Sequence, residues 1–467
     1  MSDVAALWSR HAIEHRDNAY YLSRQDAVES NARTYARKLR LAITRARGVM
    51  VEDADGRTYY DCLAGAGTLA LGHNHPFVLA ALHRAIEEGL PFQTLDLTTP
   101  VKDAFTEALL ATLPEGFRKR ARIQFCSPAG TDAIEAALKL VMTATGRRTI
   151  LVFRGGYHGM TQGALGLMGN LSAKGNLPGL IPGGQFLPYP YSYRCPFGVG
   201  GAATARLSAA QVRSLLDDPE GGVLAAGLLT EIVQGEGGVI PAPDEWILEV
   251  RSITKAHSVP LIFDEVQTGW GRTGRLYAFE HSGMTPDVLV LSKAIGGGLP
   301  LAVIIYDQSL DVWNPGAHAG TFRGNQLAMA AGLATLRIIQ EEDLASRAAV
   351  MGERMQTHLR AVQAELPFVG DVRGRGLMIG AEIVNPEGIP DSLGHPPADG
   401  TIASSIQQEC LQRGLILELG GRYGAVARFL PPLIISRDQV DSVCEIFREA
   451  CLAVHHRRVG RPFALSN

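Results

Sequence analysis

An aspartate and a lysine stand where two apolar runs end, and together they could hold a reactive cofactor. Asp264 closes the run Leu261–Phe263, and Lys293 comes just after Val288–Leu291 and before three glycines, Gly296–Gly298. A lysine amine can form a Schiff base with an aldehyde, and a carboxylate can pair with a pyridinium nitrogen. The same lysine can then move a proton to and from a substrate carbon as a general acid–base. The two residues therefore indicate a catalytic site for a pyridine-aldehyde cofactor, although a helix N-cap and an exposed lysine are their ordinary alternatives.

Composition excludes several other classes of protein. The chain has 467 residues, 46% hydrophobic and 19% charged, with a net charge of −3. This balance is ordinary for a globular enzyme and provides no basic surface for nucleic acid or membrane lipid. The six cysteines form no C-x-x-C pair, and the N-terminus has no apolar signal segment. We expect a cytoplasmic protein with reduced thiols, small-molecule substrates, and no nucleic-acid or membrane partner.

Short apolar segments alternate with helical patterns through the middle of the chain. Helices are expected at Asp132–Thr143 and Trp246–His257, between segments that read as buried strands. Near-continuous apolar strands separated by helices predict an α/β fold with a parallel sheet covered on both faces. Ligands bind at the carboxyl ends of such strands, where Asp264 and Lys293 stand. The expected strands are Ile123–Cys126, Thr149–Phe153, Leu228–Val233, Pro260–Phe263, Val288–Leu291 and Leu301–Tyr306.

The two ends of the chain have a different pattern of predicted elements. A hairpin is expected at residues 49–60, with Asp55-Gly56 as its turn. Beyond residue 330, short strands around Gly376–Ile383 and Ala427–Leu430 lie among longer helices. The chain is therefore predicted to divide into an N-terminal segment (1–75), a large domain (76–330) and a C-terminal segment (331–467). The two end segments would form a smaller α+β domain.

The turn after the first predicted strand suits a phosphate group. Gly130 and Thr131 open a helix whose free N–H groups could bind an anion, and Asp132-x-x-Glu135 has the spacing of a capping box. An ordinary strand–helix turn is the alternative. Tyr157 follows the next strand and could stack on a planar ring, or simply pack.

Four motifs together resemble the class III (ω-amino) aminotransferases, a family with the fold-type I pyridoxal-phosphate architecture. The motifs are Glu231–Gly238, Asp264–Gly269, Ser292-Lys293 and Gly320–Asn325, and the resemblance extends over nearly the whole chain. It implies a large domain with a mixed, mostly parallel seven-stranded sheet and pyridoxal 5′-phosphate as cofactor. No metal is implied. The cofactor-binding residues implied are Gly130, Thr131, Tyr157, His158, Asp264, Gln267, Lys293 and Thr321.

The resemblance also assigns individual roles. Gly130 and Thr131 would bind the cofactor phosphate, Tyr157 would stack on the ring, and Gln267 would contact its 3′-oxygen. Thr321 would reach the phosphate in the partner subunit, which implies a homodimer with shared active sites, and a dimer of dimers as the larger alternative.

Three further residues are expected to bind substrate. Glu231 resembles the carboxylate beneath the substrate, and Glu236 with Arg428 resembles the family's switch pair. In that switch the glutamate neutralises the arginine while an ω-amino donor is bound. It moves aside when a 2-oxo acid binds, and the arginine then holds the acid's carboxylate bidentately.

Longer strings resemble the diaminobutyrate–2-oxoglutarate branch of this family. Met160 stands where ornithine and 4-aminobutyrate aminotransferases carry an arginine for a substrate carboxylate. The resemblance implies reversible transfer of the 4-amino group between L-2,4-diaminobutyrate and 2-oxoglutarate. Another ω-amino donor, a racemase of the same fold and a catalytically inactive relative are the alternatives. The strings are Glu29–Tyr35, Cys62–Pro76, Tyr157–Thr161, Tyr189–Gly198 and Thr321–Gln326.

Overall fold

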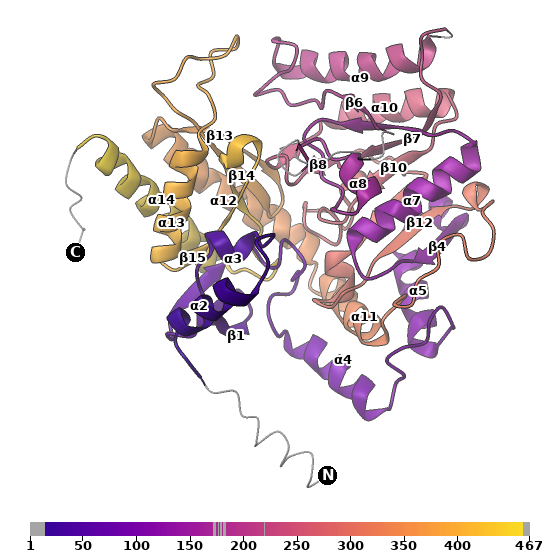
Figure 1. The fold of residues 1–467 in the computed structure, drawn as a ribbon, viewed down its shortest axis with the longest axis horizontal. Helices are drawn as coiled ribbons and strands as arrows, with labels where there is room; N and C mark the ends of the chain where they lie inside the picture. The colour runs from indigo at the N-terminus through magenta and orange to yellow at the C-terminus, as the bar shows by residue number, and fades with distance from the viewer. Residues whose placement is uncertain are drawn as a thin grey trace.

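A seven-stranded sheet forms the core of the larger part of the molecule, on the right in Figure 1. The computed structural model describes residues 15–170, 174–175, 177, 180, 184–218 and 220–460. Only β12 runs against its neighbours in this sheet, so the expected mixed, mostly parallel seven-stranded sheet is confirmed. In spatial order the strands are β4 (Ala121–Phe125), β12 (Val303–Asp307), β11 (Val288–Leu291), β10 (Leu261–Asp264), β7 (Ala225–Thr230), β5 (Thr149–Phe153) and β6 (Gly184–Leu187).

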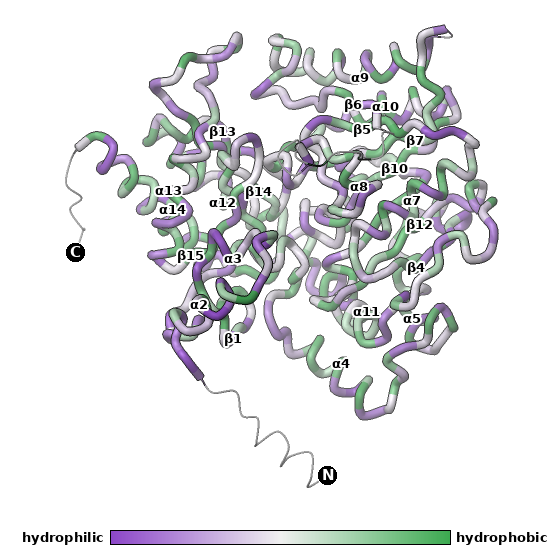
Figure 2. Tube along the Cα trace, in the orientation of Figure 1, coloured by the Kyte–Doolittle hydropathy of each residue, from purple (hydrophilic) through white to green (hydrophobic). Residues whose placement is uncertain are grey.

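Both faces of this sheet are buried, as the unbroken apolar strands predict. In β10, Ile262 joins one hydrophobic cluster, which includes residues of α7 (Gly130–Thr145), whereas Phe263 joins another, which includes Trp246 of α10 (Asp244–Ala256). Successive strand residues point to opposite faces, so each strand contributes to two cores. Hydrophobic segments gather around β7 and β10, and hydrophilic ones lie along α3 (Figure 2).

A second, four-stranded antiparallel sheet carries the C-terminal strands. Three helices pack around it and against one another: α12 (Leu344–Glu365), α13 (Gly400–Gln412) and α14 (Arg437–Arg458). In spatial order its strands are β13 (Val369–Arg375), β14 (Met378–Ile383), β17 (Val426–Phe429) and β16 (Glu418–Gly420).

The N-terminal segment joins this part of the molecule through a third sheet. The predicted hairpin is confirmed as β2 (Met50–Asp53) and β3 (Thr58–Asp61). Next to β3 runs β15 (Leu415–Ile416), and β1 (Ile43–Arg47) forms the opposite edge. The two ends of the chain thus share one sheet, as expected for a smaller α+β part; the proposed domain boundaries remain predictions.

The remaining elements connect and cover these sheets. They are α2 (Asn18–Val28), α3 (Tyr35–Lys38), α4 (Pro76–Glu87), α5 (Pro100–Ala111), α6 (Glu115–Arg118), α8 (Gln162–Gly166), α9 (Gly201–Asp217), α11 (Gln326–Glu341), β8 (Val233–Gln234), β9 (Ile240–Pro241), and the short 3-10 helices η1 (Ala278–His281), η2 (Lys293–Gly296), η3 (Gln308–Leu310) and η4 (Arg422–Gly424). None of the helices in the described ranges is long and apolar enough to cross a membrane.

The capping-box prediction at α7 is wrong. The helix begins at Gly130, before Asp132, and its N-cap is Ala129. The Asp132 carboxylate instead accepts a hydrogen bond from the Ser127 backbone N–H at 2.7 Å. Glu135 accepts from the Gly163 backbone N–H at 2.9 Å. Both acids therefore tie neighbouring loops to α7, and its first turn has no side-chain cap.

Candidate active site

The carboxyl ends of four neighbouring strands bring the predicted site residues to one edge of the large sheet. Asp264 is the last residue of β10, and Glu231 follows β7 directly. Lys293 follows β11 after one residue, and His158 lies in the loop after β5. In a parallel sheet these ends face the same crevice, which is the usual ligand site of such folds.

Asp264 and His158 form a buried pair. The His158 Nδ1 lies 2.8 Å from Asp264 Oδ2, and Asp264 Oδ1 accepts a hydrogen bond from the Val266 N–H at 3.1 Å. Burial alone would lower the pKa of His158, but the hydrogen bond and charge of Asp264 outweigh it and leave the pKa raised. The histidine therefore holds the Asp264 carboxylate in place, and the carboxylate oxygens keep lone pairs for a further donor.

Lys293 combines a buried amine with an unusual backbone. Its φ is +53°, in the left-handed region that non-glycine residues rarely adopt. Burial lowers the pKa of its amine, although the nearby Glu236 and Asp264 partly oppose this shift. A larger fraction of the amine is thus neutral, and able to act as nucleophile or base, than in an exposed lysine.

The start of α7 forms a close-packed turn against the sheet edge. A Cβ on Gly130 would lie 2.9 Å from Val266 Cγ1, and one on Gly159 would lie 2.2 Å from Thr131 Oγ1. The Thr131 hydroxyl also lies 2.7 Å from that of Thr161. Only glycines fit at these two positions, and the uncapped helix N-terminus beside them is suited to an anion such as phosphate.

Glu231 holds two backbone segments at the floor of the site. Its carboxylate accepts hydrogen bonds from the N–H groups of Tyr157 and Gly235, each at 2.9 Å. Burial raises its pKa to about 7, the nearby His158 opposing this shift. The structure therefore shows Glu231 positioning the stacking candidate Tyr157, whose ring is partly exposed; direct contact of Glu231 with substrate stays a prediction.

Gln267 links the large sheet to the second sheet. Its Nε2 donates to the Ala66 carbonyl at 2.9 Å, and its Oε1 accepts from Arg428 Nη2 at 2.9 Å. A Cβ on Gly235 would lie 2.0 Å from that Oε1, so a larger residue at Gly235 would displace the amide. The position of Gln267 is thus set from three directions, and its contact with a cofactor oxygen stays a prediction.

Arg428 and Glu236 meet as the sequence analysis expected of a switch pair. Arg428 Nη1 lies 2.5 Å from Glu236 Oε1. The arginine side chain is fully buried, whereas 33% of the Glu236 side chain is exposed, which leaves the glutamate the freer partner. Burial opposes ionisation of Glu236, but the Arg428 charge outweighs it and lowers the carboxyl pKa.

Two residues of this cluster were not identified from the sequence. Glu418 Oε2 lies 3.0 Å from Arg428 Nη1. Burial raises the pKa of the Glu418 carboxyl, and the nearby hydroxyl of Tyr35 in α3 opposes this shift. Glu418 pairs directly opposite Arg428 between β16 and β17. Its alternating position in a strand was the available signal, but only the register reveals the pairing.

Two other predicted positions lie at the periphery. Thr321 is exposed, and its carbonyl accepts a hydrogen bond from Gln93. Met160, in the loop that begins with Tyr157, is 55% exposed. Neither residue belongs to the buried group around Lys293. Thr321 lies on the surface, and a contact with a partner subunit would need it to be there.

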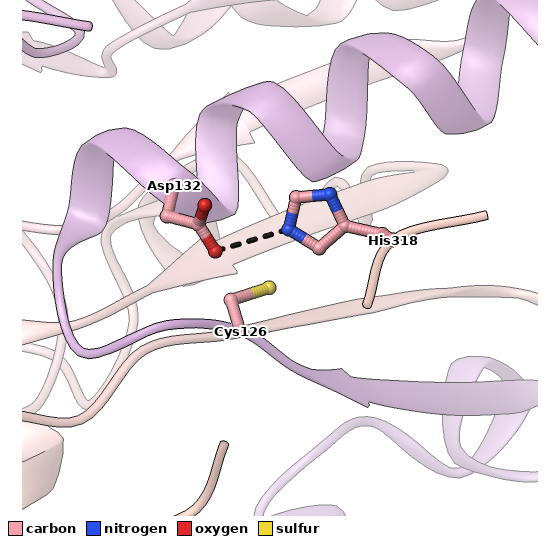
Figure 3. A group of neighbouring side chains, drawn as sticks. All are labelled: Cys126, Asp132 and His318. Carbon is pink, nitrogen blue, oxygen red and sulfur yellow. Dashed lines mark hydrogen bonds and ion pairs between the residues drawn. The ribbon is translucent and has the colours of Figure 1, made fainter. Parts of the chain in front are cut away.

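Three side chains behind the start of α7 are of the types that bind metals, but their contacts are those of a structural link. The ligand atoms of Cys126, Asp132 and His318 lie within 4.8 Å of one another (Figure 3). Burial raises the pKa of the Cys126 thiol to about 12, so it is a neutral thiol at neutral pH. His318 Nε2 lies 3.0 Å from Asp132 Oδ2, which attaches the segment before Thr321 to α7. We assign no metal to the cluster.

Comparison with known proteins identifies the family. The family model described as Aminotransferase class-III matches residues 31–451. The chain belongs to the class III aminotransferases. A diaminobutyrate–2-oxoglutarate aminotransferase of Rhizobium meliloti (strain 1021) is 58% identical, with 96% of this chain and 94% of that one covered.

Two more relatives extend this result. An enzyme of the same name from Haemophilus influenzae is 48% identical and covers 93% of this chain and 95% of its own. An amine transaminase from an uncultivated Pseudomonas species, solved in its PLP-bound form, is 30% identical with a TM-score of 0.81, covering 92% of this chain and 97% of its own. The likeness extends over nearly the full length of the aminotransferase, which confirms the family and fold expected from the motifs.

Proposed function

We propose that this class III aminotransferase uses pyridoxal 5′-phosphate to transfer the 4-amino group between L-2,4-diaminobutyrate and 2-oxoglutarate. The products are L-aspartate 4-semialdehyde and L-glutamate, and the reaction is reversible. The observation that carries the proposal is the Arg428–Glu236 ion pair at 2.5 Å, within electrostatic reach of Lys293. The names of the two most similar relatives reported above support the choice of substrate.

The site residues fit this cofactor. Its phosphate would bind at the uncapped first turn of α7, beside Gly130 and Thr131, and its ring nitrogen would face the Asp264 carboxylate. Tyr157 would stack on the ring, and Gln267 would approach its 3′-oxygen. When bound, the cofactor supplies an aldehyde carbon for the amino group and a ring that withdraws electrons from the bonds to that carbon.

Lys293 holds and moves the proton. Its amine would hold the cofactor. Burial favours the neutral form of Nζ, which would be placed to accept a proton from the substrate carbon and return it as a general acid–base.

Asp264 would pair with the ring nitrogen of the cofactor, because a carboxylate there would favour the protonated form of that nitrogen. The His158 hydrogen bond at 2.8 Å keeps the carboxylate in place. His158 is thus a positioning residue, because it acts through Asp264.

Glu236 and Arg428 admit the two substrates in turn. While the amino donor is bound, Glu236 neutralises the arginine. When 2-oxoglutarate enters, displacement of the partly exposed Glu236 frees Nη1, and Gln267 already orients Nη2 for bidentate binding of the carboxylate.

The active form is proposed to be a homodimer in the cytoplasm. The exposed Thr321 would contact the cofactor phosphate of the second subunit. An open hollow of about 580 Å³ lies beside it, lined by Lys102, Trp313 and Arg323 among others. Two guanidinium nitrogens of Arg323 in this hollow are buried and have no hydrogen-bond partner among the described residues. A partner subunit seated here would close this hollow.

An amine-donor panel tests the substrate assignment. Glutamate formation from 2-oxoglutarate would be measured with diaminobutyrate, ornithine, lysine, 4-aminobutyrate, β-alanine and taurine. We expect diaminobutyrate to give the highest kcat/KM, and 4-aminobutyrate to react poorly because Met160 cannot bind its carboxylate. A preference for 4-aminobutyrate would refute the assignment. Racemisation of an amino acid without consumption of 2-oxoglutarate would refute transamination altogether.

A further inference from the structure

Arg428 faces two carboxylates with a single positive charge. Its Nη1 makes a hydrogen bond to Glu236 at 2.5 Å and approaches Glu418 Oε2 at 3.0 Å. The second approach lacks hydrogen-bond geometry, and Glu418 Oε2 is buried with no hydrogen-bond donor among the described residues. Glu236 already neutralises the guanidinium, and burial raises the pKa of Glu418, so Glu418 is the carboxyl of this cluster that lacks a full partner.

Glu418 differs from Glu236 in its freedom to move. Glu236 lies on the irregular segment between the short strands β8 and β9, and a third of its side chain is exposed. Glu418 lies on β16, directly opposite Arg428, with only 9% of its side chain exposed. Displacement of Glu236 by a 2-oxo acid would therefore leave Glu418 in place through both halves of the reaction.

Two further residues act on the Glu418 carboxyl. Burial raises its pKa, and the Tyr35 hydroxyl and the Lys293 amine oppose this shift. Tyr35 is 45% exposed. Glu418 therefore lies near both the amine proposed to hold the reacting group and a partly exposed residue of α3.

We propose that Glu418 binds the α-ammonium group of a diamino donor. This inference rests on the function proposed above and adds the group that distinguishes its substrate. L-2,4-Diaminobutyrate carries a second, non-reacting ammonium that 4-aminobutyrate and β-alanine lack. That ammonium supplies the missing positive charge and a donor for the buried Oε2, while the mono-amino acids leave both unsatisfied. Selectivity then comes from the cost of an unpaired carboxylate as well as from the contact itself.

The alternative is that Glu418 is only a second counter-ion of Arg428. The two roles differ in their effect on the two half-reactions. A counter-ion that merely positions Arg428 would affect every substrate that the arginine contacts. A binding group for the α-ammonium would affect diamino donors alone, and its removal would leave Arg428 more positive and better able to bind 2-oxoglutarate.

Glu418→Gln separates these roles when each half-reaction is followed by itself. Rapid mixing of the loaded enzyme with one substrate at a time reports each half-reaction as a change in cofactor absorbance. We expect kcat/KM for diaminobutyrate to fall about 10- to 100-fold, the value of a hydrogen bond to a charged group. The rate constant with β-alanine should not fall, and the KM for 2-oxoglutarate should stay equal or decrease. Equal losses for every substrate would overturn the proposal.

Two further variants test the proposed role of Glu418. Tyr35→Phe removes the hydroxyl near Glu418, so it should show the same selective loss at smaller size. Glu409→Gln changes another buried glutamate, one paired with Arg413 and Arg457 away from the site, and should leave the donor ratio unchanged. Equilibrium binding of the cofactor, measured by its absorbance, should match the wild-type value in all three. Preference of the wild type for a mono-amino donor would refute the proposed function, whereas an unchanged donor ratio in Glu418→Gln would refute only this inference.

Discussion

The two halves of the site are built in different ways. The edge of the large sheet holds Asp264, His158, Glu231 and Lys293 at strand ends or in the adjoining loops. The first three are buried and held by hydrogen bonds of 2.8 to 2.9 Å. The second half stands on the small sheet around Arg428, where several charges share one guanidinium. In the function proposed above, the first arrangement would serve any amine that reaches Lys293. The second would determine which amine that is, so chemistry and selectivity would depend on separate sheets and could be changed separately.

Replacing Lys293 should have the largest effect. It should lower the rate without changing the donor preference. Lys293→Ala removes both the amine that holds the cofactor and the group that moves the proton. We expect kcat to fall by roughly 10⁴-fold or more, because general acid–base catalysis alone contributes about 10²–10⁴-fold. Steady-state glutamate formation measures the loss, and the donor preference of any residual activity should be unchanged. An active Lys293→Ala enzyme would contradict the assignment of this residue.

Asp264→Asn should have the second-largest effect on the rate. The amide keeps the shape of the side chain but cannot stabilise a proton on the ring nitrogen, so kcat should fall about 10²- to 10⁴-fold with every donor. His158→Asn should cost less, because it acts through the carboxylate. If Asp264→Asn changed the ratio of donors rather than the rate, the proposed separation between the two halves would be wrong.

Arg428→Lys should affect one substrate and spare the other. A lysine cannot reproduce the planar, bidentate grip on a carboxylate, so the KM for 2-oxoglutarate should rise about 10- to 100-fold. The half-reaction with diaminobutyrate should change far less, because Glu236 masks the cation while the donor is bound. Single-substrate mixing distinguishes the two, and equal effects on both would contradict the switch.

Gly420→Ala probes the packing beneath the arginine. A Cβ at Gly420 would lie 2.6 Å from Arg428 Cδ, so the arginine stem must shift. We expect a loss of about 1–3 kcal/mol in the free energy of unfolding, typical of overpacking, with a raised KM for 2-oxoglutarate. Gly116→Ala, where a Cβ meets nothing within 4 Å, is the matched control. Denaturant unfolding provides the measurement, and similar losses in both variants would point to a general cost of replacing glycine.

The smallest effect is expected from a buried acid outside both halves. Glu265 accepts hydrogen bonds from the N–H groups of Ala278 and Phe279 at 2.7 and 2.9 Å, and burial raises its pKa from 4.5 to about 8. The folded protein therefore retains a proton that the unfolded chain releases. The stability that this contributes is complete below pH 4.5 and is lost as the pH rises through about 8.

Glu265→Gln should flatten this pH dependence. Between about pH 7 and about pH 8, the variant should lose about 1 kcal/mol less of its free energy of unfolding than the wild type. Denaturant unfolding at the two pH values measures the difference. An unchanged slope would show that another group titrates in that range.

The sequence predicted the large-sheet half better than the small-sheet half, for a physical reason. Asp264 and Lys293 each stand beside an unbroken apolar strand, so the local pattern identified both the element and its functional end. Glu418 lies in a three-residue strand, and its proposed role depends on pairing with Arg428 across the sheet. Such pairing depends on register between distant segments, which no local pattern encodes. Tyr35 was missed for the same reason.

Errors in the fold prediction have similar causes. The strand β6 was not anticipated, because Gly184–Leu187 is short and begins with glycine. The capping box failed since Asp132 and Glu135 have the right spacing but bind loops that follow other strands. Spacing describes what a side chain can reach within its own helix, and tertiary partners can take it instead.

The pairing of β15 with β3 has a consequence for how the protein is made. Leu415 lies beside Tyr60 in that sheet, and the Tyr60 N–H donates to the Gly414 carbonyl at 2.8 Å. Contacts between segments so far apart in the chain form slowly, because the intervening loop must be closed first. A chain still emerging from the ribosome can complete the strands that carry Lys293 well before it contains Arg428. The strands that carry the proposed catalytic residues are therefore synthesised before the strands proposed to choose the substrate.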